Sequence, residues 1–537
     1  MNNEQPIEYR NEMYASTCNE VESKTLEVID VKSEIIEDEA LLHDAPSCNS
    51  KLDISMYLRK KGKTKKKRKK KHKKKFKDDY GISTFSVDYQ TTFEHAFAIR
   101  KGHNIPSYLI FQPRHESAFF FGRTLDGEFV GKPINSDGHI AVFGGSGSGK
   151  TTGIAIPNTR TWHGSIFSFD FKGDLIKTSK LGKILYLLRG HQNQYWYNPF
   201  YLLQQEGEDD LIQNARELAH AIIPLPNNSN DPFWIEAARS ILTGAIVYYF
   251  RLGVGFIEAM IEIKTTKMDQ LIRKIETDKM AAVCVNPDLE NNPKTLAGIS
   301  MELHNHISVF ATDTLIQSVF SPPKDESKDV IRWEDLAHGY DIIIRVDQSR
   351  INQWISVTRL MLVQLIRTLE RRPEKYELAD RTIVPTLLML DEFPQYGRID
   401  TITSALKILR SKNVTVSIFC QSLADLDETY GKATRCTILD NCPYKAILNA
   451  ADAETQYYFS SLVGTIKAPS KGITATTDTL GHPSGYSFTI SESYEPVIFP
   501  HEFASLSDII LLHPGPEGFC RIKKERAFTR DYYLESK

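Results

Sequence analysis

The sequence predicts an α/β protein built on a doubly wound, mainly parallel sheet, with an inserted all-helical segment and a disordered N-terminal tail. Three observations support this prediction. Short apolar runs alternate with helix-length stretches from His139 onward, residues 205–320 have almost only helical periodicity, and residues 1–80 are rich in charge and poor in aromatic side chains. The 537 residues are 41% hydrophobic and 25% charged, which excludes collagen-like, mucin-like and disulfide-scaffold classes.

Seven apolar runs after His139 have the length of strands. Helix-length segments separate them, which is the pattern of parallel strands joined by crossover helices. The runs are Ile140–Phe143, Ser165–Phe171, Ile184–Leu188, Asp341–Val346, Thr386–Leu390, Val414–Phe419 and Lys445–Leu448. We expect these seven runs to form one sheet.

Between the third and fourth runs lies a long stretch with helical periodicity. It contains the segments LIQNARELAHAII, WIEAARSILTGAIVYYF, KMDQLIRKIETDKM and TLAGISMELHNHI. A single core stops growing well below 537 residues, so two or three domains are expected. We predict a sheet domain in two parts, 81–204 and 321–537, interrupted by a helical domain, 205–320. Residues 466–497, rich in Ser, Thr, Gly and Pro, are expected to form a long surface loop or a hairpin.

The N-terminal region is an acidic block followed by a basic block. Residues 1–48 hold twelve acidic residues and three basic ones, and residues 59–77 hold fifteen of the 66 Lys and Arg of the chain. Such a composition buries too little apolar surface to offset chain entropy. We therefore expect residues 1–80 to be mostly disordered.

Cysteine usage and hydropathy indicate the compartment. The seven cysteines are odd in number and have no C-x-x-C spacing, which favours free thiols in a reducing compartment. The N-terminus, MNNEQPIEYRNEMY, has neither the basic nor the apolar part of a secretory signal. The longest apolar run, Ile241–Phe250, is about half a membrane span and is followed by Arg251. We expect a cytoplasmic chain without a transmembrane segment.

The segment GGSGSGKT, residues 144–151, lies between the apolar run HIAVF and a helix-length stretch, which is the context of a phosphate-binding P-loop. Its glycines would let backbone amides surround a phosphate, Lys150 would bridge the β and γ phosphates of ATP, and Thr151 would bind Mg²⁺. A Gly- and Ser-rich linker is the alternative, and the flanks disfavour it. The predicted ATP-binding residues are Gly144, Gly145, Ser146, Gly147, Ser148, Gly149, Lys150, Thr151 and Thr152.

A P-loop ATPase also needs two acidic residues at the end of a buried strand. The segment TLLMLDE supplies them as Asp391 and Glu392. Asp391 would belong to the Mg²⁺ shell and Glu392 would orient or activate the attacking water. A strand followed by a solvated acidic turn is the alternative, which the upstream P-loop disfavours.

Two more polar residues flank the next predicted strand. Gln421 follows its carboxyl end, where a γ-phosphate sensor would lie, and Arg410 ends the preceding helix. An exposed Arg there could reach the nucleotide of a neighbouring subunit and stabilise transition-state charge. From the residues alone, an ordinary surface Arg is the simpler interpretation of Arg410.

These segments together resemble the type IV secretion coupling proteins, the TraG-type conjugative DNA-transfer ATPases. The similarity covers about residues 110–535. The segments that carry it are GGSGSGKTTGIAIP, FDFKGDL, YNPF, DPFWIEAARSILTGAI, LLMLDEFPQYGRI, LRSKNV and CQSLADLDETYG. The resemblance implies a RecA-like fold and a homo-hexamer in which Glu392, Arg410 and Gln421 are catalytic, with Arg410 as the finger acting in trans and Gln421 as the nucleotide sensor.

The resemblance also implies a function and partners. We expect an ATP-driven coupling protein that recruits a relaxase and single-stranded DNA and drives this substrate into a type IV secretion channel. A double-stranded DNA translocase of FtsK or HerA type is one alternative, which the DPFW segment and the helical insertion disfavour. An adaptor for protein substrates that uses ATP only as a switch is another.

One departure from the family is large. Its members usually begin with a pair of transmembrane helices, whereas this chain begins with the acidic and lysine-rich blocks. We expect peripheral association with the inner face of the cell membrane, through a separate anchor subunit or through anionic lipid bound by residues 59–77. A solvated linker and nonspecific contact with nucleic-acid phosphate are the alternatives for this block, and nuclear localisation fits a bacterial transfer family poorly.

Overall fold

The computed structural model describes residues 98–102, 104–178, 182–205, 207–225, 232–286, 293–323, 328–375, 383–477 and 483–525. The predicted tail 1–80, with its lysine-rich block, lies outside the described residues. The chain divides into two compact units, of which the larger comprises Ala98–Ile466 and the residues from Tyr494 onward. The hairpin residues Lys467–Ser493 belong to the other unit.

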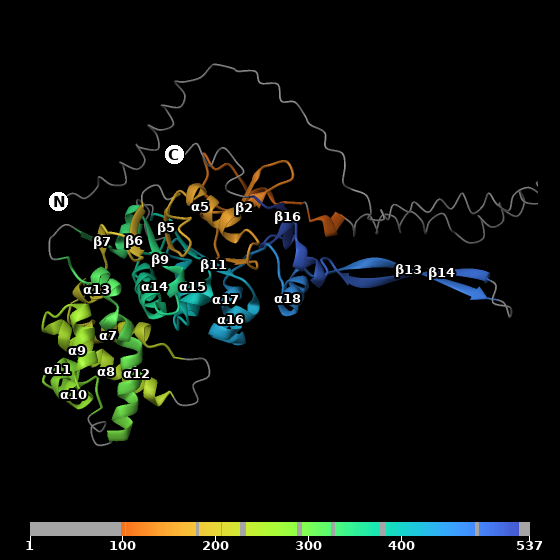
Figure 1. The fold of residues 1–537 in the computed structure, drawn as a ribbon. Coiled ribbons are helices and arrows are strands. Elements are labelled where there is room, and N and C mark those ends of the chain that lie inside the picture. Colours follow the sequence, from red (N-terminus) through yellow and green to blue (C-terminus); the bar gives the residue numbers. More distant parts are fainter. Residues whose placement is uncertain are drawn as a thin grey trace, which may run out of the picture. The chain divides into compact units, whose positions relative to one another are not determined.

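The larger unit is built on a twelve-stranded sheet with the strand order β1-β3-β2-β16-β15-β12-β4-β11-β10-β5-β9-β6 (Figure 1). The strands are β1 (Ile110–Phe111), β2 (Ala118–Arg123), β3 (Phe129–Pro133), β4 (Ile140–Phe143), β5 (Ser165–Asp170), β6 (Gly182–Leu187), β9 (Asp341–Val346), β10 (Thr386–Leu390), β11 (Val414–Cys420), β12 (Tyr444–Ile447), β15 (Asp508–Leu512) and β16 (Phe519–Lys523).

The seven predicted runs are the seven parallel strands, from β12 to β6 in the sheet order. The remaining five strands pair antiparallel at the β12 side of the sheet. This confirms the predicted mainly parallel α/β fold and adds an antiparallel extension that the alternation of strand and helix does not predict.

Helices cover both faces of the parallel part of the sheet. Lys150–Ala155 forms a wide helical turn that continues into α5 (Ile156–Thr161), and Figure 1 shows α5 on the face opposite α14 (Ile355–Glu370) and α15 (Ile402–Leu409). Every residue of β4, β5, β10 and β11 is consequently buried. This burial explains why these strands are nearly continuous apolar runs in the sequence.

Between β6 and β9, the described residues from Leu211 to Phe320 form only helices. They are α7 (Leu211–Ile222), α8 (Phe233–Arg251), α9 (Phe256–Thr265), α10 (Met268–Glu276), α11 (Lys279–Ala282), α12 (Pro293–Thr312) and α13 (Thr314–Phe320). α7 packs against both α8 and α14, and these helices belong to the same compact unit as the sheet. The domain boundaries at residues 204 and 320 therefore stay a prediction.

Smaller elements complete the chain. These are α6 (Tyr201–Gln205), α16 (Leu423–Tyr430), α17 (Lys432–Asp440), α18 (Ala453–Val463) and two two-stranded sheets, β7 (Tyr195–Trp196) with β8 (Asp329–Val330) and β13 (Thr465–Thr477) with β14 (Pro483–Pro496). The predicted loop or hairpin at residues 466–497 is thus a hairpin. Cys284, Cys420, Cys436, Cys442 and Cys520, the cysteines that the structure describes, are all free thiols. No described helix is both long and apolar enough to cross a membrane.

Candidate functional site

The candidate site lies where four adjacent parallel strands end. β12, β4, β11 and β10 are neighbours in the sheet, with Phe143 opposite Ile447 on one side and Cys420 on the other. Because the carboxyl ends of parallel strands meet at one edge, the segments after these strands come together there. The P-loop, Gln421 and the acidic pair follow β4, β11 and β10, so the sheet brings together three motifs that are far apart in sequence.

The P-loop has the backbone that its glycines permit. Gly147 and Gly149 have φ values of 75° and 98°, in the left-handed region that side chains disfavour. Lys150 is only 6% exposed, and its ammonium donates a hydrogen bond to the carbonyl of Gly144. The hydroxyl of Ser148 is buried without a hydrogen-bond partner among the described residues. A loop with an inward-facing ammonium and an unsatisfied hydroxyl fits a bound phosphate.

The first acidic residue, Asp391, is positioned to share a cation with the P-loop. The hydroxyl of Thr151 donates to Asp391 Oδ2 across 3.3 Å. Burial, followed by the charge of Glu392, raises the pKa of Asp391 above its usual range. A divalent cation would offset the cost of this buried carboxylate, and oxygen ligands are those that Mg²⁺ prefers. The side chains of Thr151 and Asp391 therefore fit the predicted Mg²⁺ site.

Glu392 contacts, through its side chain, two residues that follow other strands of the sheet. Its backbone has φ 52°, an uncommon conformation for a residue with a side chain, of the kind that clusters at functional sites. The side-chain amide of Gln421 donates to Glu392 Oε2 at 3.1 Å, and Lys150 Nζ lies 3.9 Å from Glu392 Oε1. The predicted water-orienting carboxylate, phosphate-binding lysine and sensor amide thus form one cluster.

Arg410 lies at the amino ends of the parallel strands, opposite the ends where the cluster lies. It follows α15 and precedes β11, whose seven residues span roughly 20 Å between Arg410 and Gln421. Its side chain is exposed. Its charge contributes, after a hydrogen bond from Lys375, to lowering the pKa of Asp137, which precedes β4. Arg410 is therefore remote from the P-loop of its own chain.

A buried histidine ties the Arg410 turn to the sheet. His139 Nε2 donates to the carbonyl of Leu406 in α15 at 2.6 Å, and the amide of Val416 in β11 donates to Nδ1 at 3.0 Å. Burial lowers the pKa of His139 to about 4, so the ring is neutral and can serve as donor and acceptor at once. His139 spans the two elements that flank the turn carrying Arg410.

Sequence reasoning missed three residues: Asn449 and Asp170, at the carboxyl ends of the strands, and His139, at the amino end of β4. Asn449, after β12, accepts a hydrogen bond from the amide of Gly145 at 2.7 Å. Asp170, at the end of β5, accepts hydrogen bonds from the backbone amides of all five residues from 172 to 176. The available signal was a polar residue directly after an apolar run for Asn449 and an acidic residue near the end of an apolar run for Asp170, whereas His139 had none.

The chain is similar in sequence to known transfer proteins. A family model described as "Type IV secretory system Conjugative DNA transfer" matches residues 57–517. Protein VirD4 of Rhizobium rhizogenes is 22% identical over 431 residues, which cover 76% of this chain and 61% of VirD4. Conjugal transfer protein TraG of Escherichia coli is 20% identical over 427 residues, which cover 73% of this chain and 64% of TraG. The chain thus spans less than two thirds of the length of these two relatives.

Solved structures show the same fold. The unbound bacterial conjugative coupling protein TrwBdeltaN70 matches with a TM-score of 0.60 at 14% identity, over 80% of this chain and 91% of that chain. The plasmid coupling protein TrwB in complex with ADP and Mg²⁺ matches with a TM-score of 0.59 at the same identity and coverage. Since the family model covers most of the chain, this protein belongs to the type IV secretory system conjugative DNA transfer family.

Proposed function

We propose that this protein is an ATP-driven coupling protein that recruits a relaxase with single-stranded DNA and moves this substrate into a type IV secretion channel. The observation that carries the proposal is the cluster of Lys150, Glu392 and Gln421 at the carboxyl edge of the sheet, with Thr151 against Asp391. Membership of the conjugative DNA transfer family supports DNA as the cargo and a type IV secretion system as its route.

In the proposed reaction, water attacks the γ phosphorus of ATP. The new bond forms between the water oxygen and phosphorus as the bond to the β–γ bridging oxygen breaks, and the products are ADP, phosphate and a proton. Glu392 orients the water and accepts its proton, while Gln421 fixes the carboxylate through Oε2. Lys150 and the P-loop amides hold the phosphates. Thr151 and Asp391 would hold Mg²⁺, which would supply positive charge against the charge that develops on the transferred group.

The site of each chain is completed by a neighbouring chain in a homo-hexamer. Arg410 is exposed and lies at the edge of the sheet opposite its own P-loop, so it is available to an adjacent subunit. An arginine supplied in this way stabilises the charge of the transition state.

We place the assembly at the inner face of the cell membrane. Residues 59–77 provide fifteen positive charges, each worth about 1 kcal/mol of attraction near an anionic bilayer. A separate membrane-anchor subunit is the other route to the same location, and channel components complete the partners.

Comparing Lys150→Ala with the unchanged protein tests the proposal. The full chain should hydrolyse ATP faster when single-stranded DNA is added, and Lys150→Ala should abolish turnover with and without DNA while the fold remains intact by circular dichroism. Removing the Lys150 ammonium deletes the phosphate contact without exposing core. Undiminished turnover in the variant would exclude the P-loop as the hydrolytic site. Turnover that does not respond to DNA would favour the ATP-switched adaptor.

A further inference from the structure

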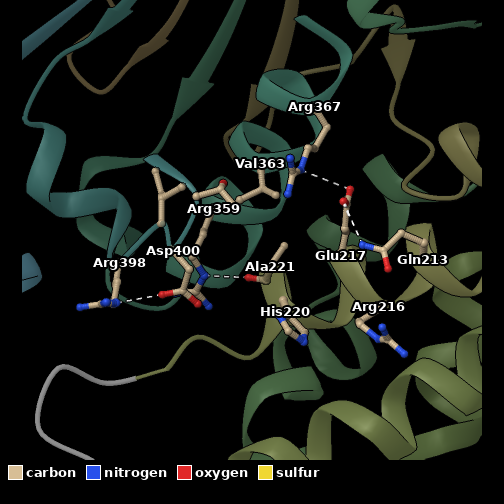
Figure 2. Close-up of a pocket in the computed structure, with 12 residues that line it drawn as sticks. Gln213, Arg216, Glu217, His220, Ala221, Arg359, Val363, Arg367, Arg398 and Asp400 are labelled. Carbon is tan, nitrogen blue, oxygen red and sulfur yellow. Dashed lines mark hydrogen bonds and ion pairs between the residues drawn. The ribbon is translucent and has the colours of Figure 1, made fainter. Parts of the chain in front are cut away.

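A pocket of about 140 Å³, lined by no residue of the P-loop, lies between α7, α14 and the segment that follows the acidic pair (Figure 2). Arginines dominate its lining. Among the lining residues are Arg216, His220, Arg359, Arg367, Arg398 and Thr401. In Figure 2, His220 lies between Arg216 of α7 and Asp400 of the opposite wall.

The two carboxylates of the pocket are already paired with arginines. Asp400 lies 2.8 Å from Arg398 Nε and 3.1 Å from Arg239 Nη2. Glu217 lies 3.3 Å from Arg367 Nε. Both carboxylates are therefore already engaged in direct contacts with arginines, and among the described residues neither contacts Arg216.

Other polar groups of the pocket lining, on Arg216, Thr401 and Arg359, can donate hydrogen bonds. Arg216 is exposed and makes no hydrogen bond or ion pair with the residues that the structure describes. The hydroxyl of Thr401 is buried without a hydrogen-bond partner among them. Among the described residues, Arg359 donates hydrogen bonds to the carbonyls of Ala221 and Ile222 and to the hydroxyl of Ser356, and no carboxylate contacts it directly. A ligand that accepts hydrogen bonds and carries negative charge matches this lining.

The pocket is also linked to the acidic pair by a short, well-packed segment. Tyr396 donates a hydrogen bond to the carbonyl of Asp391 at 2.7 Å, and the next residue, Gly397, has φ 71°. A Cβ added at Gly397 would lie 3.2 Å from Arg359 Nη1, so the segment rests directly on this arginine. Arg398, Asp400 and Thr401 follow at once. An anionic ligand held by Arg398 and Thr401 is connected to Glu392 through fewer than ten residues of chain.

We propose that this pocket binds a backbone phosphate of the single-stranded DNA and that the segment from Glu392 to Thr401 relays this binding to the ATP site. The inference rests on the proposed function and assigns it a contact with the substrate. A phosphodiester is favoured over an isolated carboxylate because a nucleic acid presents such anions at regular spacing, so that exposed Arg216 can exchange one phosphate for the next.

The test measures binding of a labelled single-stranded oligonucleotide to the full chain by fluorescence anisotropy, over a series of salt concentrations. Arg216→Gln should weaken binding about tenfold, as expected for one charge-assisted hydrogen bond. It should reduce the slope of log affinity against log salt by about 0.7, and adding Arg398→Gln should double that reduction. Arg216→Gln should also lower the ratio of DNA-stimulated to basal ATP turnover. Arg189→Gln, an exposed arginine outside the pocket, is the matched control and should change none of these values.

The outcomes separate this inference from the proposed function. If the unchanged protein binds the oligonucleotide and Arg216→Gln retains its affinity and salt slope, the pocket proposal is wrong and the proposed function stands. If the variants lose binding to polyglutamate but not to the oligonucleotide, the pocket takes an acidic peptide, which also overturns the inference. If the unchanged protein binds no single-stranded DNA, both proposals are wrong.

Discussion

Glu392 shows how a single residue joins three strands into one site. Its left-handed backbone follows β10 directly, and its carboxylate meets Gln421 after β11 and Lys150 after β4. The residue types and their order along the chain were predictable, because each motif has a chemical reason. The mutual contacts were not, since they depend on strand order in the sheet, which local pattern does not encode.

Glu392→Gln should bind ATP with nearly unchanged affinity but hydrolyse it several hundredfold to a thousandfold more slowly. Binding depends on the P-loop and Thr151, whereas attack depends on a carboxylate that accepts a proton. Equilibrium binding of a fluorescent ATP analogue and single-turnover hydrolysis measure the two effects separately. A collapse of nucleotide affinity would instead give Glu392 a structural role.

At the scale of elements, periodicity predicted the parallel part of the sheet and missed its extension. The central parallel strands β4, β5, β10 and β11 are buried on both faces and therefore appear as apolar runs between helices. β6, at the end of the sheet, is only partly buried. The five antiparallel strands are joined mostly by turns, so they lack the alternation with helices that marked the others. β2, the run AFFFGR, is fully buried as well, but no helix-length segment separates it from β3.

The contact between α15 and β11 through His139 predicts a pH dependence of stability. The pKa of His139 falls from 6.5 to about 4 on folding, so between these values the unfolded chain binds the proton and the folded chain does not. Stability should therefore fall as the pH is lowered from 6.5 to 4, by about 3 kcal/mol from this residue.

His139→Asn removes the titration while keeping an acceptor for the amide of Val416. The unchanged protein should be the more stable of the two at pH 7, and its advantage should shrink by about 3 kcal/mol towards pH 4. Urea unfolding at several pH values measures the difference. Parallel stability curves for the two proteins would show that His139 does not titrate as its burial implies.

At the scale of the whole molecule, deleting residues 1–80 separates the ATP site from the proposed membrane attachment. The deletion removes no residue of the described fold, so ATP turnover should be retained. It removes the fifteen positive charges of residues 59–77, so binding to vesicles that contain anionic lipid should be lost. Sedimentation with such vesicles measures the effect, and vesicles of neutral lipid are the control. Equal sedimentation of both proteins would assign membrane association to the folded part of the chain.

In the proposed hexamer, one subunit completes the ATP site of the next. Arg410→Ala should bind ATP almost normally yet lose about 10³- to 10⁵-fold in turnover, the range for arginine fingers in related chemistry. An Arg410→Ala subunit keeps its own Lys150 and Glu392, and a Glu392→Gln subunit keeps its Arg410. A mixed ring of these two inactive variants therefore contains some interfaces with a complete site.

The decisive measurement is the ATPase activity of Arg410→Ala and Glu392→Gln protein mixed under conditions where rings are seen by negative-stain imaging. A site shared between subunits predicts partial recovery of activity in the mixture and none in either variant alone or where rings do not form. No recovery, despite co-assembly demonstrated by affinity tags on each variant, would contradict it. Arg410 would then act within its own chain or outside catalysis, and the assignment of a shared site would be wrong.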